Sequence, residues 1–198
     1  MENTDGYITG KVGDTEIVVT MYPTADDWIQ AKRRALITVD KPVKKMPDPA
    51  WMNKLITSKH SPLRRLKFSV TFYNIPSFVS VHFCRHVHLM PYGGDFQPYV
   101  TSQRNDRQKK YDRDEAPQNA PVNMILDMNA EELLILAHKR LCFNADPLTV
   151  KITEEMLRII EVLCPEFHGF FMPECEYLGR CDEAFGSCGY FEGKHGNS

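Results

Sequence analysis

Hydrophobic and polar residues alternate in two stretches of the N-terminal half, and this period of two predicts strands. Residues 7–21 (YITGKVGDTEIVVTM) hold two β-branched runs around Gly13-Asp14, a pattern typical of a β-hairpin. Residues 65–73 alternate as well, with the apolar set at Leu66, Phe68, Val70 and Phe72. We therefore expect a hairpin and, later in the chain, a half-buried strand that ends near residues 74–76.

Two segments between these strands have the apolar spacing of helices. Asp26 or Asp27 is expected to cap the first helix, which carries Trp28 on its apolar side. The stretch PAWMNKLITS, residues 49–58, predicts a short second helix. Helices are thus expected between the hairpin and the following strand.

The C-terminal half has a helical period over two longer segments. Asn129 is expected to cap a helix over residues 130–143, and Pro147 to begin another over residues 147–164. The positions expected to face the core are Leu133, Leu136, Ala137, Leu141, Val150, Met156, Leu157, Ile160 and Leu163. Strands followed by helices predict an α+β fold.

The heptapeptide HFCRHVH, residues 82–88, concentrates candidate ligands in a short space. On a strand, His82, Cys84, His86 and His88 would line one face and resemble a soft-metal ligand set. On a helix, His82, Arg85 and His86 would share a face, while Cys84 would point elsewhere. The secondary structure therefore decides between a metal site and an anion or cofactor site.

A helix over residues 77–87 is favoured, because Pro76 is a start signal and Phe78, Val81 and Cys84 form an apolar stripe. A His-x-x-x-His pair alone indicates a metal only weakly, and one histidine packed in the core is an equally good interpretation. A neighbouring arginine disfavours a bound cation, so we expect no metal between His82 and His86.

Residues 90–121 are rich in Gly, Pro, Asp and Asn, which predicts a long loop. Within it, Ser102, Gln103, Arg104 and Arg107 offer a hydroxyl, an amide and two guanidinium groups. Such a set suits a phosphate group, although a solvated charged loop explains the composition equally well.

Composition limits the class of protein. A chain of 198 residues with 42% hydrophobic content is sufficient for one globular domain with a sizeable core. The net charge of −2 gives no sign of nucleic-acid or membrane binding. No apolar run is long enough to span a bilayer, and the polar start MENTDGYITGK does not resemble a signal peptide. We therefore expect a cytoplasmic protein.

Six cysteines in such a chain are expected to be reduced thiols or metal ligands rather than disulfides. Four of them, Cys164, Cys175, Cys181 and Cys188, lie in or next to the tail, residues 165–198. Their spacing lacks the close pairs of zinc ribbons, so the tail cysteines are expected to be reduced and structural.

Four stretches, in this order, resemble motifs of one known family. SKHSPLRRLKFSV is similar to a His-x-Pro entry into a strand, CRHVH to the start of an Arg-His-Arg signature, and TSQRND to its Ser-x-Arg close. MNAEELLILAHKRLCFNA resembles the Asn-Ala-Arg…Leu-Arg helix. Together they resemble the flavin-dependent thymidylate synthases of the ThyX type, over about two-thirds of the chain.

The resemblance implies one ThyX-like domain over residues 1–198, with a central sheet flanked by helices. It also implies a homotetramer with FAD and nucleotide sites between subunits. The implied reaction is methylation of dUMP to dTMP, in which methylenetetrahydrofolate is the carbon donor and NADPH reduces the flavin. No nucleic acid or membrane partner is implied.

The resemblance also assigns roles to residues. Arg140 matches the arginine that polarises the uracil. FAD-contacting positions are Ser61, Arg85, His86 and Asn129. Nucleotide-contacting positions are His82, Ser102, Gln103, Arg104 and Arg113.

The chain departs from the family pattern at two cations. Val87 stands in place of the signature's second arginine, and Glu131 in place of the Asn-Ala-Arg arginine. The spacer between Arg85 and Ser102 is also longer than is usual in the family. The nucleotide half of the pattern is therefore better kept than the flavin half.

Three alternatives remain open. A divergent relative of the same fold would modify another pyrimidine nucleotide or use another one-carbon donor. A nucleotide-binding protein would keep the phosphate site and lack flavin chemistry. A zinc protein would use the histidine and cysteine clusters.

Overall fold

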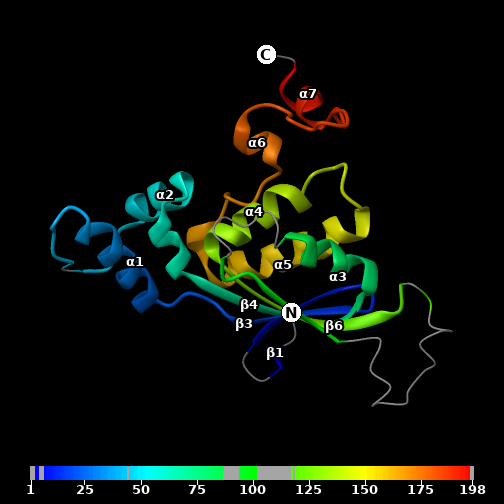
Figure 1. Ribbon diagram of the computed structural model, residues 1–198, viewed down its shortest axis with the longest axis horizontal. Coiled ribbons are helices and arrows are strands. Elements are labelled where there is room, and N and C mark those ends of the chain that lie inside the picture. Colours follow the sequence, from blue (N-terminus) through cyan, green and yellow to red (C-terminus); the bar gives the residue numbers. More distant parts are fainter. Residues whose placement is uncertain are drawn as a thin grey trace.

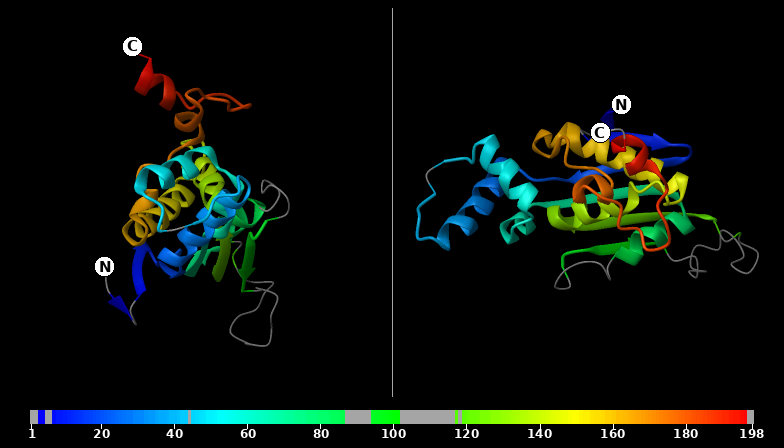
Figure 2. Two further views of the ribbon diagram at one scale, coloured as in Figure 1. Left: turned by 90° about the vertical axis from the view of Figure 1, so that its left-hand side faces the viewer. Right: turned by 90° about the horizontal axis from the view of Figure 1, so that it is seen from above.

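The described part of the chain forms one antiparallel sheet of six strands with helices on one face (Figures 1 and 2). The computed structural model describes residues 3–4, 7–43, 45–86, 94–101, 117 and 119–196. The strand order is β1 (Asn3–Thr4), β2 (Tyr7–Val12), β3 (Thr15–Met21), β4 (Lys67–Pro76), β6 (Pro121–Asn129) and β5 (Gln97–Val100). Helices and an antiparallel sheet confirm the α+β prediction.

The predicted hairpin is confirmed. β2 pairs with β3 through Val12 and Thr15, and Gly13 between them has a φ of 58°. This left-handed conformation is open to glycine at little cost, which explains the tight turn. The hairpin forms one side of the sheet, next to β4.

The predicted strand at residues 65–73 is confirmed in its facing and in its end, but it starts two residues later than expected. Phe68, Val70 and Phe72 are fully buried. β4 begins at Lys67, after the short η1 helix (Ser61–Arg65), and continues to Pro76, within the expected end at residues 74–76. An irregularity between Phe72 and Ile75 lets the strand continue to that end, because pairing with β6 resumes at Ile75.

A loop was expected over residues 90–121, and no strand was expected directly after it. The structure has a strand in each of these places. Gln97–Val100 is the edge strand β5, and Pro121–Asn129 is β6, which lies between β4 and β5. β6 buries Val122, Met124, Leu126 and Met128 on one face. The alternation was present in the sequence, but two methionines and flanking prolines weaken its β signal.

The first helix, α1 (Ala25–Ile37), begins two or three residues earlier than expected. Its cap is Thr24, whose hydroxyl accepts from the Asp27 backbone N–H at 3.4 Å. The Asp27 carboxylate accepts in return from the Thr24 backbone N–H at 2.9 Å. The expected cap, Asp26 or Asp27, is therefore wrong, because Asp27 is the reciprocal partner in a capping box.

The other helices follow the sequence prediction closely. α2 covers Pro49–Ser58, α3 Ser77–Cys84, α4 Ala130–Arg140 and α5 Pro147–Leu163, followed by a short η5 turn (Pro165–Phe167). Asn129 caps α4 as expected, and Leu133, Leu136 and Ala137 are buried. These helices bury one continuous core against the sheet.

α5 lies close against the hairpin at Gly10. A Cβ atom at this position would lie 2.0 Å from Oε1 of Glu155 and 2.9 Å from Cδ1 of Ile159. Glycine therefore permits the close approach of strand and helix. On the other side of the core, the Phe83 ring of α3 packs on Phe72 of β4 with centroids 5.4 Å apart.

The C-terminal segment, residues 172–196, stands away from this core (Figure 1). It contains the short helices α6 (Glu174–Leu178) and α7 (Tyr190–His195), and neither has a buried residue. Phe185 between them is 99% exposed. This segment lacks an apolar core of its own.

No helix covers the second face of the sheet in the views of Figures 1 and 2. Large side chains at least 41% exposed lie on it: Tyr7, Met21, Tyr73, Tyr99 and Ile125. Helices thus flank the described sheet on one side only. Within the described residues, no helix combines the length and apolar character needed to cross a bilayer.

Candidate functional site

Arg140, in the last turn of α4, reaches across to α3 and joins the two helices. Its Nε donates to Nε2 of His86 at 2.6 Å, and an Nη2 hydrogen donates to the backbone carbonyl of His82 at 2.6 Å. The side chain is therefore fixed along one edge of the guanidinium. Within the described part of the chain, no hydrogen bond of its Nη1 accompanies these two.

His86 is fully buried and is the acceptor of this contact. Arginine only donates, so Nε2 of His86 carries no proton and the neutral ring carries it on Nδ1. Burial, with the Arg140 and Lys139 charges adding to it, lowers the pKa of His86 to about 3. His86 is therefore an uncharged acceptor that orients Arg140 at neutral pH.

His82 begins a short polar chain that leads to α5. Its Nδ1 lies 2.8 Å from the Thr149 hydroxyl, which in turn donates to Oδ1 of Asp146 at 3.1 Å. With its proton directed at Asp146, the hydroxyl accepts from Nδ1–H of His82. Burial and the Arg140 charge lower the pKa of His82, so the ring is neutral with Nε2 free to accept.

Arg85 lies beside this cluster and is exposed. Burial and the nearby Arg85 charge lower the pKa of Arg140. Two guanidinium groups in one place, one of them half-buried, favour an anionic ligand. The arrangement agrees with the expectation that these residues share a helix edge, but it does not test what they bind.

The expected apolar stripe of α3 is wrong. The helix buries Val79, Phe83 and, beyond its end, His86, whereas Val81 is 41% exposed and Phe78 and Cys84 are half-buried. The reason is the sheet, which takes the aromatic Phe83 onto Phe72 and so rotates the expected face outward. His86 is consequently a core histidine and an arginine partner at once.

Asn129 sits at the opposite end of α4 and is almost fully buried. Its Oδ1 accepts from the Glu132 backbone N–H at 3.1 Å, and its Nδ2 donates to Asp95 at 3.3 Å. An 11-residue helix is about 16 Å long, so Asn129 and Arg140 lie far apart. Both sides of the Asn129 amide are already engaged within the chain.

Glu131, which stands where the family pattern has arginine, accepts from Nε of Arg64 in η1 at 2.5 Å. The carboxylate is mostly buried and the guanidinium about one-third exposed. At residue 131 an anion therefore stands in place of the arginine of the family pattern. It also neutralises a second cation, the guanidinium of Arg64. The charge expected near a flavin from this part of the pattern is absent at residue 131.

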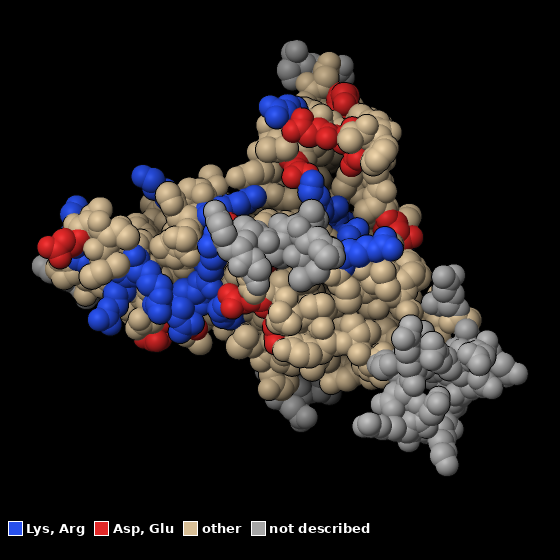
Figure 3. All heavy atoms as spheres, in the orientation of Figure 1, with Lys and Arg blue, Asp and Glu red and all other residues tan. Residues whose placement is uncertain are grey.

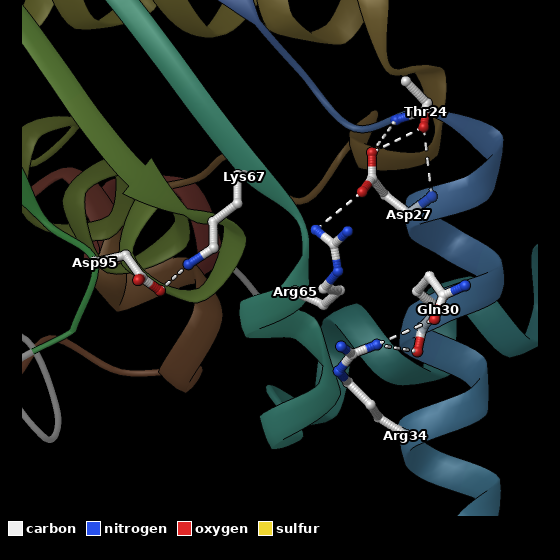
Figure 4. A network of polar contacts seen from close by, with 7 residues as sticks. All are labelled: Thr24, Asp27, Gln30, Arg34, Arg65, Lys67 and Asp95. Atoms are coloured by element: carbon white, nitrogen blue, oxygen red, sulfur yellow. Dashed lines mark hydrogen bonds and ion pairs between the residues drawn. The ribbon is translucent and has the colours of Figure 1, made fainter.

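Ser61 opens η1 and is exposed at the rim of a hollow of about 390 Å³ between α1, α2 and η1. Arg34, Lys54 and His60 supply its polar lining, and Trp51 supplies an aromatic wall. Figure 4 shows how this end is built: Arg34 is held by Gln30, Arg65 bonds Asp27 at 2.9 Å, and Lys67 pairs with Asp95. The hollow thus combines cations with an apolar surface.

Charge is distributed unevenly over the face drawn in Figure 3. Lys and Arg side chains gather over α1 and η1, and a further group lies near the end of α4. Asp and Glu side chains gather on the C-terminal segment. Anionic ligands are therefore favoured along the helical layer and disfavoured on the segment that contains α6 and α7.

The structure brings together Arg140, His82, Arg85 and His86, and it separates this group from Ser61 and Asn129. Val87, His88, Ser102, Gln103, Arg104, Arg107 and Arg113 lie outside the described residues. The tautomers that follow from Arg140 and Thr149 were not accessible from sequence, because they depend on contacts between distant segments.

Sequence reasoning missed Asp146 and Thr149 as supports of His82. The Asp-Pro-x-Thr order at the start of α5 was a usable signal, since Asp146 caps the helix by accepting from the Thr149 backbone N–H at 2.9 Å. It also missed His138, whose Nδ1 lies 3.4 Å from Nζ of Lys59. Burial, with the Lys59 and Lys139 charges adding to it, lowers the pKa of His138 to about 3.

No family model and no curated protein matches the chain by sequence. Solved structures do match by fold. Thymidylate Synthase X (ThyX) from Helicobacter pylori, crystallised with FAD and dUMP, gives a TM-score of 0.60 at 13% identity, covering 79% of this chain and 97% of that one. The UMP/dUMP methylase PolB from Streptomyces cacaoi, bound with 5-Br dUMP, gives 0.60 at 13% identity, covering 80% and 94%. The resemblance to the ThyX fold is thereby confirmed.

Proposed function

We propose that this chain is a nucleotide methylase of the flavin-dependent thymidylate synthase type, which converts dUMP to dTMP. FAD is the proposed cofactor, methylenetetrahydrofolate the carbon donor and NADPH the reductant. The shared fold and the motif order support the class of reaction. The geometry around Arg140 supports the chemistry.

The observation that carries the proposal is the fixed, half-buried guanidinium of Arg140. Methylation at C5 of a pyrimidine builds enolate-like negative charge on the ring carbonyl side. A cation that is already oriented when that charge develops stabilises the transition state without reorganisation. His86 and the His82 carbonyl orient Arg140 in this way, and its Nη1 edge is the one proposed to face the base.

The nucleotide phosphate is proposed to bind Ser102, Gln103, Arg104 and Arg113, with His82 at another part of the same nucleotide. Arginine forks with a hydroxyl donor match phosphate oxygens. His82, held as an Nδ1–H donor to Thr149, offers Nε2 as an acceptor.

FAD is proposed to bind in part at the Ser61 hollow, and Arg85 and His86 are proposed to lie near its reactive ring. The hollow fits a dinucleotide chemically, since it pairs Arg34 and Lys54 with the flat Trp51 surface. Bound FAD would supply the electron-transfer chemistry of the reaction. Asn129 fits less well as a direct ligand, because its amide is engaged by Glu132 and Asp95. Its proposed role is to hold the start of α4.

The two halves of this site lie at opposite ends of α4, and a homotetramer with sites between subunits would bring halves of different copies together. The sheet face with exposed Tyr73, Tyr99 and Ile125 offers an apolar surface for such contacts. We therefore propose that the active form is the homotetramer.

A second candidate is methylation of UMP as well as dUMP, because PolB matches the fold as well as ThyX does. A third is nucleotide binding without flavin chemistry. It is favoured by the Arg64–Glu131 pair, which removes positive charge from the flavin half of the motif. These candidates predict different products and different spectra.

The test uses the full chain, purified and mixed with FAD, and then assayed with methylenetetrahydrofolate and NADPH. A flavin spectrum that stays with the protein, together with dTMP formed from dUMP, supports the proposal. Equal methylation of UMP favours the second candidate. Tight binding of dUMP by a colourless protein that forms no methylated product favours the third and contradicts the flavoenzyme assignment.

A further inference from the structure

Phe185 lies in the connection between α6 and α7, within a loop over residues 181–188 that we call the tip loop. Its side chain is 99% exposed, more than any other large hydrophobic side chain in the part of the chain that the structure describes. Gly186 turns the loop directly after it, with a φ of 111° that other residues rarely adopt. An aromatic ring buries about 150–250 Å² when it is fully packed, and Phe185 has almost none of this burial within its own chain.

Two carboxylates precede this ring in the tip loop. Asp182 and Glu183 are both exposed, and Figure 3 shows acidic side chains gathered on this C-terminal segment. Asp182 pairs with Arg180 at 2.8 Å, but both side chains are exposed, and pairs of this kind are weak and easily exchanged. Glu183 accepts from the Phe185 backbone N–H at 3.5 Å, within the loop itself. The tip loop therefore presents an aromatic ring beside negative charge.

The opposite charge is concentrated in residues 25–67, which contain eleven Lys and Arg, four Asp and no Glu. The whole chain has a net charge of −2, so this positive excess is local. Figure 3 shows the cations gathered over α1 and η1. Figure 4 shows that Arg65 and Lys67 are paired with carboxylates, whereas Arg34 is held by the neutral Gln30 and keeps its charge. Part of the positive charge is therefore not neutralised by the neighbouring residues.

The hollow of about 390 Å³ between α1, α2 and η1 lies within this basic region. Trp51 and Leu55 give it an apolar lining, and Arg34 and Lys54 stand among them as cations. The ammonium group of Lys32 lies 6.0 Å from the centroid of the Trp51 ring. An apolar pocket with charged groups beside it is the usual receptor for an aromatic anchor that carries the opposite charge next to its ring.

We propose that the tip loop docks in this hollow on a second copy of the chain. The Phe185 ring enters the hollow beside Trp51, and the carboxylates of the loop meet the cations Arg34 and Lys54. Burial of the ring supplies the affinity, and the opposite charges determine how the loop is oriented. The contact joins two different surfaces, a loop of one copy and a hollow of the other, so it is of the heterologous kind.

A second copy, rather than the same chain, is the occupant because the tip loop is held away from its own hollow. In Figures 1 and 2 the loop lies on the side of α6 that faces away from α2. Asn144 donates to the Gly186 carbonyl at 3.0 Å, and the rings of Phe143 and Tyr190 stack 4.3 Å apart. Both contacts would break if the loop swung over to α1 and α2 of its own chain. Docking on another copy keeps them, and the loop then binds in the conformation that it already has.

The docked form belongs to the chain without flavin. The hollow is the one proposed above to hold part of FAD, so FAD and the tip loop of a second copy exclude one another there. The docking does not rest on the proposed methylase activity, because it uses neither the flavin nor Arg140. It also leaves the exposed sheet face with Tyr73 and Tyr99 to other contacts.

The test is photo-cross-linking of the full chain without added FAD. Phe185 is replaced by p-benzoylphenylalanine, and this copy is mixed with an equal amount of unmodified chain labelled with heavy nitrogen. After irradiation and digestion, mass spectrometry identifies the peptides joined to residue 185. We expect peptides from residues 34–62, with light and heavy nitrogen in equal shares, because the hollow then comes from either kind of copy. In the unmodified chain, a carbodiimide should join Lys54 of one copy to Asp182 or Glu183 of another.

A charge reversal tests the orientation of the loop. Lys54→Glu in the heavy copy should lower the yield of its cross-link about 3–10-fold, because an attractive exposed pair becomes a repulsive one. Lys151→Glu is the matched control, since Lys151 is an exposed cation on α5, and it should leave the yield unchanged. Circular dichroism establishes that each variant is folded.

Four results would overturn the proposal. One is a cross-link to the hollow that contains light nitrogen alone, since the loop would then dock within its own chain. Another is a cross-link to the sheet face around Tyr73 and Tyr99 in place of the hollow. A folded chain in which neither reagent joins the tip loop to residues 34–62 excludes the contact. A yield that Lys54→Glu leaves unchanged would show that the carboxylates of the loop do not face this cation.

Discussion

Two regions of the molecule begin from the same stretch of chain and are stabilised in opposite ways. One is the contact between α3 and α4, and the other is the C-terminal segment. Arg140 faces a buried histidine and a carbonyl at fixed distances, whereas Cys142, two residues on, faces an open hollow. Apolar burial determines the first arrangement. The second has exposed ion pairs, short helices and thiols, and neither of its helices buries a residue.

Arg140 and Cys142 are close neighbours in the chain, yet only the side chain of Arg140 is preorganised by the core. An arginine held by the core is ready for an anion before the anion arrives, which is the condition for electrostatic catalysis. The C-terminal segment, whose two helices bury no residue, has no such preorganisation. Three experiments separate these two situations, beginning with the largest expected effect.

The first prediction compares two phenylalanines. Phe83 is fully buried against Phe72, and Phe185 is 99% exposed. Phe83→Ala should lower the free energy of unfolding by about 3–5 kcal/mol, the range for deleting a core aromatic ring. Phe185→Ala should leave it within about 0.5 kcal/mol. Urea unfolding followed by circular dichroism measures both, and equal losses would contradict the division into a packed core and an unpacked segment.

The second prediction concerns Arg140. Arg140→Ala should reduce turnover of dUMP by about 10²–10³-fold, the scale for losing one oriented donor in an oxyanion-type site. Arg140→Lys should recover only part of it, because lysine cannot bond His86 and the His82 carbonyl with one planar group. The assay measures dTMP formed per enzyme at saturating substrate.

Lys151→Ala is the matched control for Arg140→Ala, because Lys151 is an exposed cation on α5 away from both sites. Its turnover should equal that of the unmodified protein. If Arg140→Ala unfolds, Arg140→Lys still tests the role through its reduced turnover at unchanged melting temperature. Full activity of a folded Arg140→Ala protein would rule out a catalytic arginine at this position.

The third prediction is a loss of stability in mild acid. His86 and His138 have pKa values of about 3 in the folded chain, below the ordinary value near 6.5 that applies after unfolding. Below pH 6.5 only the unfolded chain takes up these protons, so stability is present above that pH and is lost toward pH 3. Each histidine should cost about 2 kcal/mol between pH 7 and 5.

Replacing one of the two histidines isolates this effect. His138→Gln should make the loss between pH 7 and 5 smaller by about 2 kcal/mol. His168→Gln is the control, since that side chain is 82% exposed. Urea unfolding at both pH values gives the comparison. An unchanged pH dependence in His138→Gln would mean that His138 takes up protons in the folded state as readily as in the unfolded one.

Much of the fold could be predicted from local pattern. α2, α4, α5 and the hairpin have clear caps, prolines or turns, and their bounds agree with those expected within a few residues. β6 could not be recognised, because its alternation follows a Gly- and Pro-rich stretch and its methionines are weak strand formers. The rotation of α3 also depended on a distant residue, Phe72, which no local rule includes.

The candidate site could be predicted less completely, for a physical reason. His82, Arg85 and His86 were expected to share a helix edge, but the contact of Arg140 with His82 and His86 was not predicted. The hydrogen bonds that determine tautomer and charge come from residues 54 or more positions apart, so they follow from tertiary packing. The same holds for Cys142, which joins the tail thiols only through the path of the chain after α4.

The pairing of β4 with β6 has a consequence for how the chain folds. Pro76 pairs with Pro121, and β3 meets β4 through Met21 and Ser69, so both inner joins of the sheet close long loops. Contacts between residues so far apart in sequence predict slow folding, because these strands must meet before the sheet is complete. The hairpin of β2 and β3 is expected to form earlier. Loop-closure entropy grows only logarithmically, so doubling the length between β4 and β6 would cost about 0.6 kcal/mol. The interval between these strands can therefore vary in length at little thermodynamic cost, which permits a spacer longer than the family pattern.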